Sequence, residues 1–435
     1  MAEFIVLPTQ LYPRPKSFWR QWKRVVVIED PHYVNKKMHP LKLWMHRASM
    51  REYFDSINHS SKTYVEYDQA FNCDSDFVIC HPTDKAMVQK YKKGTMIDPP
   101  GFLLKINELA ELDTSSHDVF YRRMRVKFDI LMKNSKPIGN KWSYDAANRQ
   151  RFPQDYIETN PLQRSFKSKY INDARGIVDL SALTFKANNM MWPTNRRTAL
   201  KDLKSFVLSR LSKFGPYQDA IKENVVVGYH SCISVPLNIG LILPSDVIKE
   251  AMKYKVPIES VEGFLRQVIG WREYIRMKYV LYGPMDWSFL KKMNTPIDKS
   301  WYSAATGIDT LDWSIQRVID YAYAPHIERL MLLANYAVLL RLRFEDVKNW
   351  FLTMTADGYD WVMLNVSMGV NGLSPTNRFM KRAYLTNGTY LKKMGLKLSK
   401  KDDDQLKQLY DRFIRDNKAL AKKDYRLAAA VKRLN

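Results

Sequence analysis

The sequence has few of the residues that build a disulfide framework or a thiolate metal site. Its 435 residues include three cysteines, Cys73, Cys80 and Cys232, and no CxxC pair. We therefore expect a reduced, cytoplasmic protein without a four-cysteine cluster. The eight histidines contain no HxxxH pair, which makes a histidine metal site a poor interpretation.

Glycine motifs and long apolar runs are also missing. None of the 16 Gly belongs to a GxGxxG or GxxxxGK[ST] motif, which disfavours a Rossmann dehydrogenase and a Walker-type nucleotidase. No uninterrupted apolar run reaches the roughly 18 residues of a membrane span, and residues 1–10 lack the regions of a signal peptide. We expect no membrane partner.

Positive charge is what the sequence has in excess. Its 69 Lys and Arg outnumber its 45 Asp and Glu, leaving a formal charge of +24. Such an excess is typical of proteins that bind a polyphosphate or another anionic surface. Aromatic residues make up 13% of the chain, which suits ordinary packing first and the stacking of a planar cofactor or bases second.

Apolar patterning divides the chain into three parts. Short apolar runs at 4–7, 25–29, 64–67 and 76–80, with a helical pattern at about 40–57, predict an α/β domain with a parallel sheet over residues 1–133. Residues 134–195 lose periodicity and gather Pro and Asn, as expected of a long linker. An all-α domain follows over 196–435, in which 261–279 and 327–338 form two amphipathic helices.

Two segments of the helical part combine polar groups with apolar periodicity. In HSCISVPLNIG at 230–240, hydroxyls and backbone amides precede a helix, which suits phosphate binding or an ordinary helix cap. In VEGFLRQVIGWREYIR at 261–276, Gln267, Arg272 and Glu273 interrupt an apolar helix. They suit either the wall of a deep polar pocket or a plain surface network.

Three further features carry chemistry. His326 stands near a helix start, where a lone histidine is more often structural than catalytic. Asp357 and Asp360 lie among aromatic residues and can either accept hydrogen bonds from a heterocycle or be solvated loop acids. Lys and Arg interleaved with Tyr beyond residue 378 suit a groove that follows phosphates, or a solvated positive face.

Several motifs in order resemble one family. The two segments above are followed by YAPHIERLM at 323–331, WFLTMTADGYDW at 350–361 and LTNGTYLKKM at 385–394, and preceded by related stretches at 29–54 and 122–153. Together they resemble the cryptochrome and photolyase superfamily, in its photolyase-related, bacterial (6-4) photolyase branch. The resemblance implies an antenna-type domain at 1–133, a linker at 134–195 and a helical FAD-binding catalytic domain at 196–435.

The resemblance also implies an activity and its partners. It predicts a monomeric enzyme that binds UV-damaged DNA and repairs (6-4) photoproducts by electron transfer from photoexcited reduced FAD to a flipped-out lesion. A cyclobutane dimer photolyase and a cryptochrome-like light sensor are the alternatives.

Site residues follow from the matched motifs. His326 is the predicted catalytic residue, because it can donate a proton to the photoproduct. FAD would contact Ser231, Ile233, Ser234, Asn238, Gln267, Trp271, Arg272, Arg329 and Asp357. Electrons would reach it through Trp350, with Tyr302 or Trp301 as later steps; DNA would contact Arg378, Lys381, Arg382, Lys392 and Lys393; a lumazine-type antenna would lie near Gln10, Glu29, Asp30 and Tyr33.

The chain departs from this branch at three places. Relatives carry four cysteines for a [4Fe-4S] cluster, but 307–313 and 394–412 contain none, so we expect no cluster. Met363 stands where the branch tends to place an acid near the flavin. Pro325 stands where the first residue of a His-His pair is common.

Overall fold

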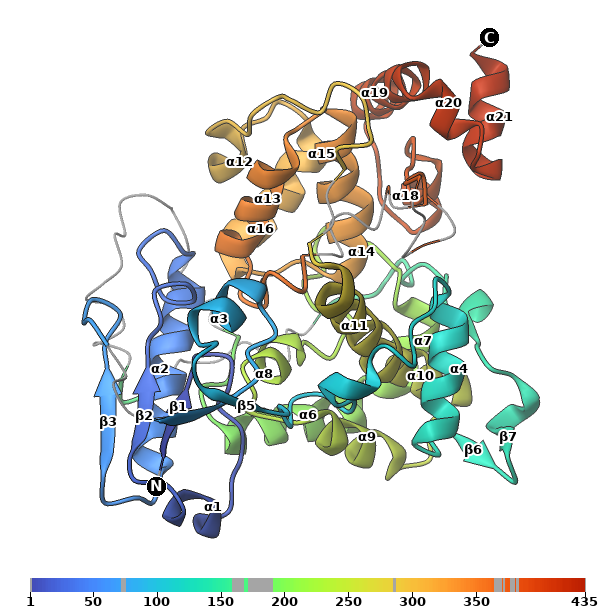
Figure 1. Cartoon of the computed structure of the whole chain (residues 1–435). Coiled ribbons are helices and arrows are strands. Elements are labelled where there is room, and N and C mark those ends of the chain that lie inside the picture. Colours follow the sequence, from blue (N-terminus) through green and yellow to red (C-terminus); the bar gives the residue numbers. More distant parts are fainter. Residues whose placement is uncertain are drawn as a thin grey trace.

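The N-terminal part of the protein is a parallel sheet. The computed structural model describes residues 2–71, 76–158, 168–170, 191–284, 287–363, 370, 372–375, 380 and 383–434. Five strands pair in the order β3-β2-β1-β4-β5, and every pairing is parallel. Their bounds are β1 Glu3–Val6, β2 Val25–Ile28, β3 Lys62–Val65, β4 Phe77–Cys80 and β5 Thr95–Ile97. The sheet lies at the left of Figure 1.

The strands that sequence patterning predicts are present, and β5 is additional. All side chains of β1 and β2 are buried, as expected where both faces of a parallel sheet are covered. The helices of this part are α1 Lys16–Arg20, α2 Pro40–Ser56, α3 Lys85–Lys90 and α4 His117–Lys127, with a short turn η1 at Ile106–Glu108. The predicted α/β fold class is confirmed.

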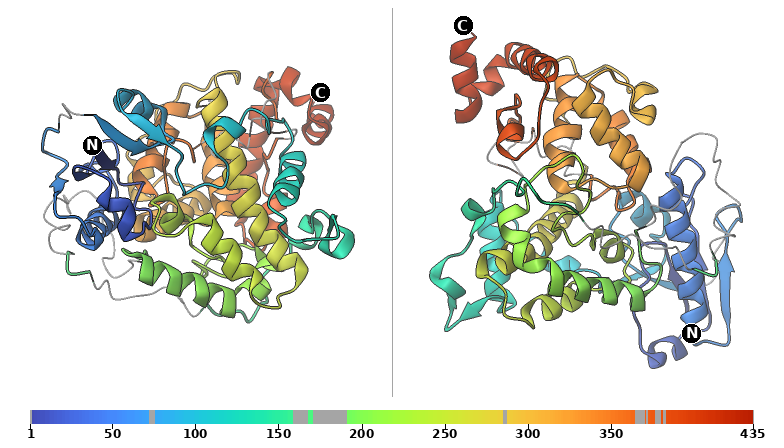
Figure 2. Two further views of the ribbon diagram at one scale, coloured as in Figure 1. Left: turned by 60° about the horizontal axis from the view of Figure 1, so that its bottom comes forward. Right: turned by 180° about the vertical axis from the view of Figure 1, so that it is seen from behind.

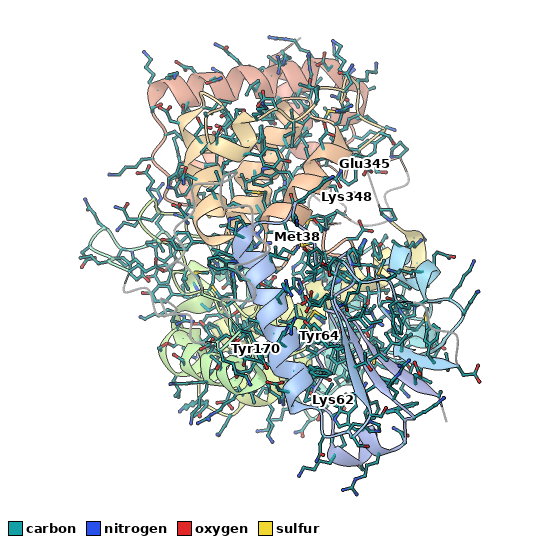
Figure 3. All side chains as sticks on the ribbon, turned by 90° about the vertical axis from the view of Figure 1, so that its left-hand side faces the viewer. Met38, Lys62, Tyr64, Tyr170, Glu345 and Lys348 are labelled. Carbon is teal, nitrogen blue, oxygen red and sulfur yellow. The ribbon has the colours of Figure 1, made fainter. Side chains whose placement is uncertain are left out.

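Helix α2 is internal to the molecule rather than a surface cover. Every residue from Pro40 to Met50 is buried, and its apolar side chains share one hydrophobic cluster with the sheet and with helices beyond residue 196. Figure 3 looks onto this helix: Met38 lies at its upper end, near the helix that carries Glu345 and Lys348, and Lys62 lies at its lower end. Polar residues of α2 must therefore find partners inside the protein.

Between the sheet and the helical part, the chain makes a small hairpin. Strands β6 Met132–Lys133 and β7 Lys136–Pro137 pair antiparallel, and the short turns η2 Ile138–Asn140 and η3 Asp145–Ala147 follow. Helix α4, although within the predicted first domain, packs against η5 (Arg266–Arg272) and α11 (Glu273–Tyr282) of the helical part, and Figures 1 and 2 show it away from the sheet. The boundaries at 133 and 195 stay a prediction.

The remainder is helical. Its first group is α6 Arg196–Ser209, α7 Leu211–Tyr217, α8 Ser234–Asn238, α9 Pro244–Met252, α10 Ile258–Leu265, η5 Arg266–Arg272 and α11 Glu273–Tyr282. Its second group is α12 Ser300–Ser303, α13 Asp309–Tyr321, α14 His326–Glu328, η6 Arg329–Ala334, α15 Asn335–Leu339, α16 Phe344–Met354, α18 Thr389–Lys393, α19 Lys400–Asp416, α20 Lys418–Ala421 and α21 Tyr425–Arg433. The second group has its own hydrophobic cluster.

The two predicted amphipathic helices are each interrupted by a π-helical stretch. Residues Arg266–Arg272 separate α10 from α11, and Arg329–Ala334 separate α14 from α15. Within η5, Gly270 allows a close approach, because a Cβ there would lie 2.9 Å from Nε2 of His117. π-Helical turns are rare and are frequent at functional sites, and these two carry four of the predicted flavin contacts.

Candidate functional site

The centre of the site is a buried ion pair between Arg329 and Asp357. Nη1 of Arg329 lies 2.7 Å from Oδ1 of Asp357, and its Nε donates to the carbonyl of Ala324. Burial alone would raise the pKa of Asp357, but the charge of Arg329 and a hydrogen bond from Ser234 hold that pKa below its ordinary value. Asp357 is therefore an ionised, internal group, and its interpretation as a solvated loop acid is wrong.

Helix α8 closes this pair from one side. Nδ2 of Asn238 donates to the backbone carbonyl of Asp357 at 3.2 Å. The N-cap residue of α8 is Ile233, and no side chain caps this helix within the described residues. The polar residues Ser231 and Ser234 are half-buried and do not serve as the ordinary helix cap; the hydroxyl of Ser234 bonds to Asp357 instead.

Arg272 joins α8 to the α/β part. Its Nη1 donates to the carbonyl of Gly101 at 2.7 Å, and its Nη2 lies 3.4 Å from the carbonyl of Leu237. Its neighbour Glu273 is fully buried and accepts the backbone N–H groups of Leu103 and Leu104. Arg272 and Glu273 are 3.9 Å apart. The surface-network interpretation of this pair is wrong, because both groups are internal.

Some predicted flavin residues are brought together and others are not. Ser234, Asn238, Arg272, Arg329 and Asp357 are linked through the contacts above. In contrast, Trp271 stacks on His117 with ring centroids 3.6 Å apart and an interplanar angle of 7°, and Nε2 of Gln267 lies 3.4 Å from the carbonyl of Gly263. No described contact of these two reaches Asp357.

The residues at this centre fit an acceptor-rich ligand. Nη2 of Arg329 and Nε of Arg272 are buried and have no acceptor among the described residues. An unpaired buried guanidinium nitrogen is costly, and the carbonyl and phosphate oxygens of a flavin nucleotide would satisfy such donors.

His326 is the first residue of α14, three residues before Arg329, which begins η6, and it faces outward. Its side chain is 49% exposed, and its Nε2 lies 3.3 Å from Oδ1 of Asp219. Asp219 also accepts the hydroxyl of Tyr390 at 3.2 Å. Burial raises the pKa of Asp219, but its bonds with His326 and Tyr390 outweigh this and lower it. Sequence reasoning missed Asp219, because no local pattern marks a single acid 107 residues from its partner.

The predicted electron route has a buried and an exposed end. Nε1 of Trp350 donates to the carbonyl of Trp301 at 2.8 Å, and the two rings meet edge to face with centroids 5.4 Å apart. Both rings are buried, whereas Tyr302 is 41% exposed. Of the two predicted later steps, Trp301 is therefore the one in contact with Trp350.

A cleft lies where the carboxyl ends of the strands meet the helical part. Its cavity volume is about 10 Å³, which is about the room that one water molecule needs. The sheet contributes residues that follow β1 and β4, and the helical part contributes Asn238, Arg272 and Trp361; the lining is Thr9, Gln10, Tyr12, His81, Pro82, Thr83, Asp84, Phe102, Asn238, Arg272 and Trp361. This edge is where open parallel sheets usually hold ligands.

Only one predicted antenna residue, Gln10, lines this cleft. Glu29 is fully buried, and its carboxylate accepts from Arg47, Tyr64 and the backbone of Tyr67. Asp30 is likewise engaged by Lys90 and Tyr91, and Tyr33 is buried. Glu29 and Asp30 thus have structural partners already. Sequence reasoning missed His81, Thr83 and Asp84, although their place directly after β4 could have found them.

The predicted DNA contacts are described in part. Arg378, Lys381 and Arg382 lie outside the described residues. Lys392 is exposed and forms an ion pair of 2.8 Å with Asp403, and Lys393 is exposed. At the two departures, Met363 is buried and Pro325 is the N-cap of α14.

The described residues contain neither a metal-binding group nor a membrane-spanning helix. No three His, Cys, Asp or Glu side chains there form a group that could hold a metal ion. No helix of the described chain is long and apolar enough to cross a bilayer.

Solved photolyase structures have a similar fold. Among solved structures, the fold matches a bacterial class III photolyase from Agrobacterium tumefaciens with a TM-score of 0.58 and 13% identity, covering 100% of this chain and 91% of that one. It also matches an archaeal photolyase from Sulfolobus tokodaii, described with two FAD molecules, with a TM-score of 0.57 and 13% identity, over 97% and 99% of the two chains. The protein thus has the photolyase and cryptochrome fold.

Sequence comparison is more specific. Residues 4–180 match the model of the family described as deoxyribodipyrimidine photo-lyase-related protein. A (6-4) photolyase from Agrobacterium fabrum is 32% identical over 288 residues, which cover 64% of this chain and 56% of that relative. The chain thus matches just over half the length of this relative. Both matches are to photolyase-related proteins, as the motif resemblance predicted, and the family model covers residues 4–180.

Proposed function

We propose that the protein is a light-dependent DNA repair enzyme of the photolyase type that acts on (6-4) photoproducts. One observation carries the proposal: an exposed imidazole, His326 of α14, stands three residues before Arg329, whose ion pair with Asp357 is largely buried. Repair of a (6-4) photoproduct needs both features, a sequestered cofactor and an accessible proton donor. We further propose the division at 133 and 195, with α4 packed on the helical part.

FAD is the cofactor that this proposal requires. When bound and reduced, it supplies the light-driven electron that starts repair. The chain would hold it through Arg329, Asp357, Asn238, Ser234 and Arg272, with Ser231 and Ile233 at its phosphates and Gln267 and Trp271 at the pocket wall. Asp357 keeps Arg329 oriented, and the buried surroundings exclude water and strengthen each of these contacts.

His326 would hold and donate the proton. The carboxylate of Asp219, 3.3 Å from Nε2 of His326, orients the ring. Since His326 is exposed beside Tyr390, a base flipped out of the duplex can reach it, and a damaged pair costs less to extrude than an intact one.

We also propose the two ancillary sites. Trp350, Trp301 and the exposed Tyr302 would form the route by which oxidised flavin regains electrons. A lumazine-type antenna would bind at the sheet edge near Gln10, with Asp84 as a hydrogen-bonding group and Phe102 and Trp361 as apolar walls. The cleft would have to widen to admit it, because its present volume is about that of one water molecule.

The test is product analysis after illumination. FAD-loaded protein is mixed with oligonucleotides that carry one (6-4) photoproduct or one cyclobutane dimer, exposed to blue light and analysed by chromatography. We expect restored pyrimidines from the (6-4) substrate. Repair of the cyclobutane substrate alone would reassign the lesion, and FAD binding without any repair would favour a light sensor.

The His326→Ala variant should abolish (6-4) repair while keeping the FAD content and stability of the wild type. Its one described ion pair is half-exposed and contributes less than about 1 kcal/mol to stability. His59→Ala, which changes a histidine beside β3, is the control. Repair by the His326 variant at the wild-type rate would refute the proposed role.

A further inference from the structure

Helix α2 presents three polar residues to the helical part. His39, Lys42 and His46 are spaced i, i+3 and i+7, so they share one face of the helix, and all three are buried. The backbone N–H of His39 donates to the carbonyl of Thr353, and its Nε2 lies 2.8 Å from the carbonyl of Ile319. Nε2 of His46 lies 3.0 Å from the hydroxyl of Tyr359.

Lys42 makes the central contact of this face. Its Nζ donates to the carbonyls of Leu352 at 2.7 Å and Gly358 at 2.6 Å, and lies 5.0 Å from the centre of the Tyr359 ring. The two carbonyls belong to the residues that bracket the segment 353–357. One ammonium of the α/β part therefore fixes both ends of the segment that carries Asp357.

This segment is held tightly. A Cβ on Gly358 would lie 2.6 Å from the carbonyl oxygen of Phe351 and from the hydroxyl of Thr355. Asn238 and Arg329 hold Asp357 itself. Three separate elements thus determine where the carboxylate lies, and Lys42 is the anchor that comes from α2.

The charge of Lys42 has no close counter-ion. No carboxylate of the described residues lies within 4.0 Å of its Nζ. Burial lowers the pKa of Lys42 to about 7. The more distant Asp357 and Asp84 attract its proton but do not offset burial, and Arg329 repels the proton. A buried cation without a partner is costly, and beside a cofactor site it provides a place for negative charge on the ligand.

We propose that Lys42 is a positioning residue of the flavin site: it fixes the Asp357 segment, and its charge makes the site prefer reduced, anionic FAD over oxidised FAD. The role rests on the proposed function. It also explains why a helix of the α/β part buries a lysine where methionine would fill the same space.

Redox titration of the FAD-loaded protein tests this role. In Lys42→Met, the preference for reduced over oxidised FAD should fall about tenfold, which for a two-electron couple lowers the midpoint potential by about 30 mV. Lys42→Arg should restore most of the preference. Lys62→Met is the matched control, because Lys62 also donates to backbone carbonyls, those of Phe54, Asp55 and Ile57, and lies 4.6 Å from an aromatic ring, at the other end of α2.

A pH profile of the wild type gives a second readout if Lys42→Met does not fold. Around Lys42, Asp357 has a lowered pKa, Tyr359 a raised one, and burial lowers the pKa of His39 to about 4 and of His46 to about 3. Between roughly pH 6 and pH 8, Lys42 is then the group of this set that titrates. Because forming anionic reduced FAD from oxidised FAD takes up two electrons and one proton, the midpoint potential falls with pH in every variant. In the wild type it should fall more steeply above about pH 7 than in Lys42→Arg, whose side chain stays charged.

The outcomes separate the two proposals. Equal pH slopes of the midpoint potential in the wild type and Lys42→Arg, or a folded Lys42→Met protein with the wild-type potential, would overturn the role of Lys42 alone. A wild type that binds no FAD would overturn the proposed function, and this role with it.

Discussion

At the scale of single residues, Asp357 is the most informative position. The Asp357→Asn variant leaves Arg329 as a buried charge without its partner, which we expect to cost about 3 kcal/mol of stability. It should also reduce the FAD retained on purification, because Arg329 loses its orientation. The measurements are the FAD released per protein chain and the free energy of unfolding in urea.

The control for Asp357 is an exposed ion pair. Asp118 pairs with Arg122 on the surface of α4, and Asp118→Asn should change stability by less than about 1 kcal/mol and leave FAD content unchanged. Equal effects of the two variants would contradict the assignment of Asp357 to the site.

The sequence could predict residues in motifs but not their distant partners. His326, Arg329 and Asp357 stand in segments whose order is recognisable. Asp219 and Lys42 meet them only through the fold, from 107 and more than 300 residues away, and neither lies in a pattern that marks it. Burial could not be predicted either, because the sequence shows that Arg272 and Glu273 are neighbours but not that both side chains are internal.

At the scale of elements, periodicity located the helices but not their irregularities. The pattern of apolar residues over 261–279 and 327–338 predicted two continuous helices, and a π-helical stretch interrupts each. A π-turn shifts the face of the helix by about one residue, and an apolar stripe buried on several sides hides such a shift. The strands were easier, because short buried runs of β-branched residues are distinctive.

The buried histidines of α2, His39 and His46, predict that the folded protein loses stability in acid. Burial lowers the pKa of His39 to about 4 and of His46 to about 3, below the ordinary value of 6.5. The unfolded chain therefore takes up protons first as pH falls, and stability is lost from about pH 6.5 downwards. We expect the urea midpoint to be lower at about pH 5 than at about pH 7.

His46→Gln isolates one contribution, because glutamine can still bond to Tyr359 but does not titrate. The difference in midpoint between the two pH values should shrink in this variant. His59→Gln, which changes a partly exposed ring, should keep the wild-type difference. A His46 variant as sensitive to acid as the wild type would show that α2 does not carry this effect.

At the scale of the whole molecule, the sheet and the helical part are not separate bodies. One hydrophobic cluster joins strand residues such as Phe4 and Val26 to Phe206 and Phe264 of the helices, and α4 crosses to the helical side. Composition gave the order of the two parts and the sign of the charge. It could not show that α2 would serve both parts, because that depends on packing between distant segments.

The net charge of +24 predicts binding to DNA that weakens steeply with salt.

Two neighbouring lysines of α18 test whether DNA contacts this helix. Lys392 is neutralised by Asp403, whereas Lys393 is exposed and has no ion pair among the described residues. If Lys393 contacts a phosphate, Lys393→Gln should make the slope of log affinity against log salt less negative by about 0.9. Lys392→Gln should change it less, since Asp403 already offsets that charge. Equal slopes for the wild type and the Lys393 variant, in titrations of lesion-bearing duplex over several salt concentrations, would place the DNA away from α18.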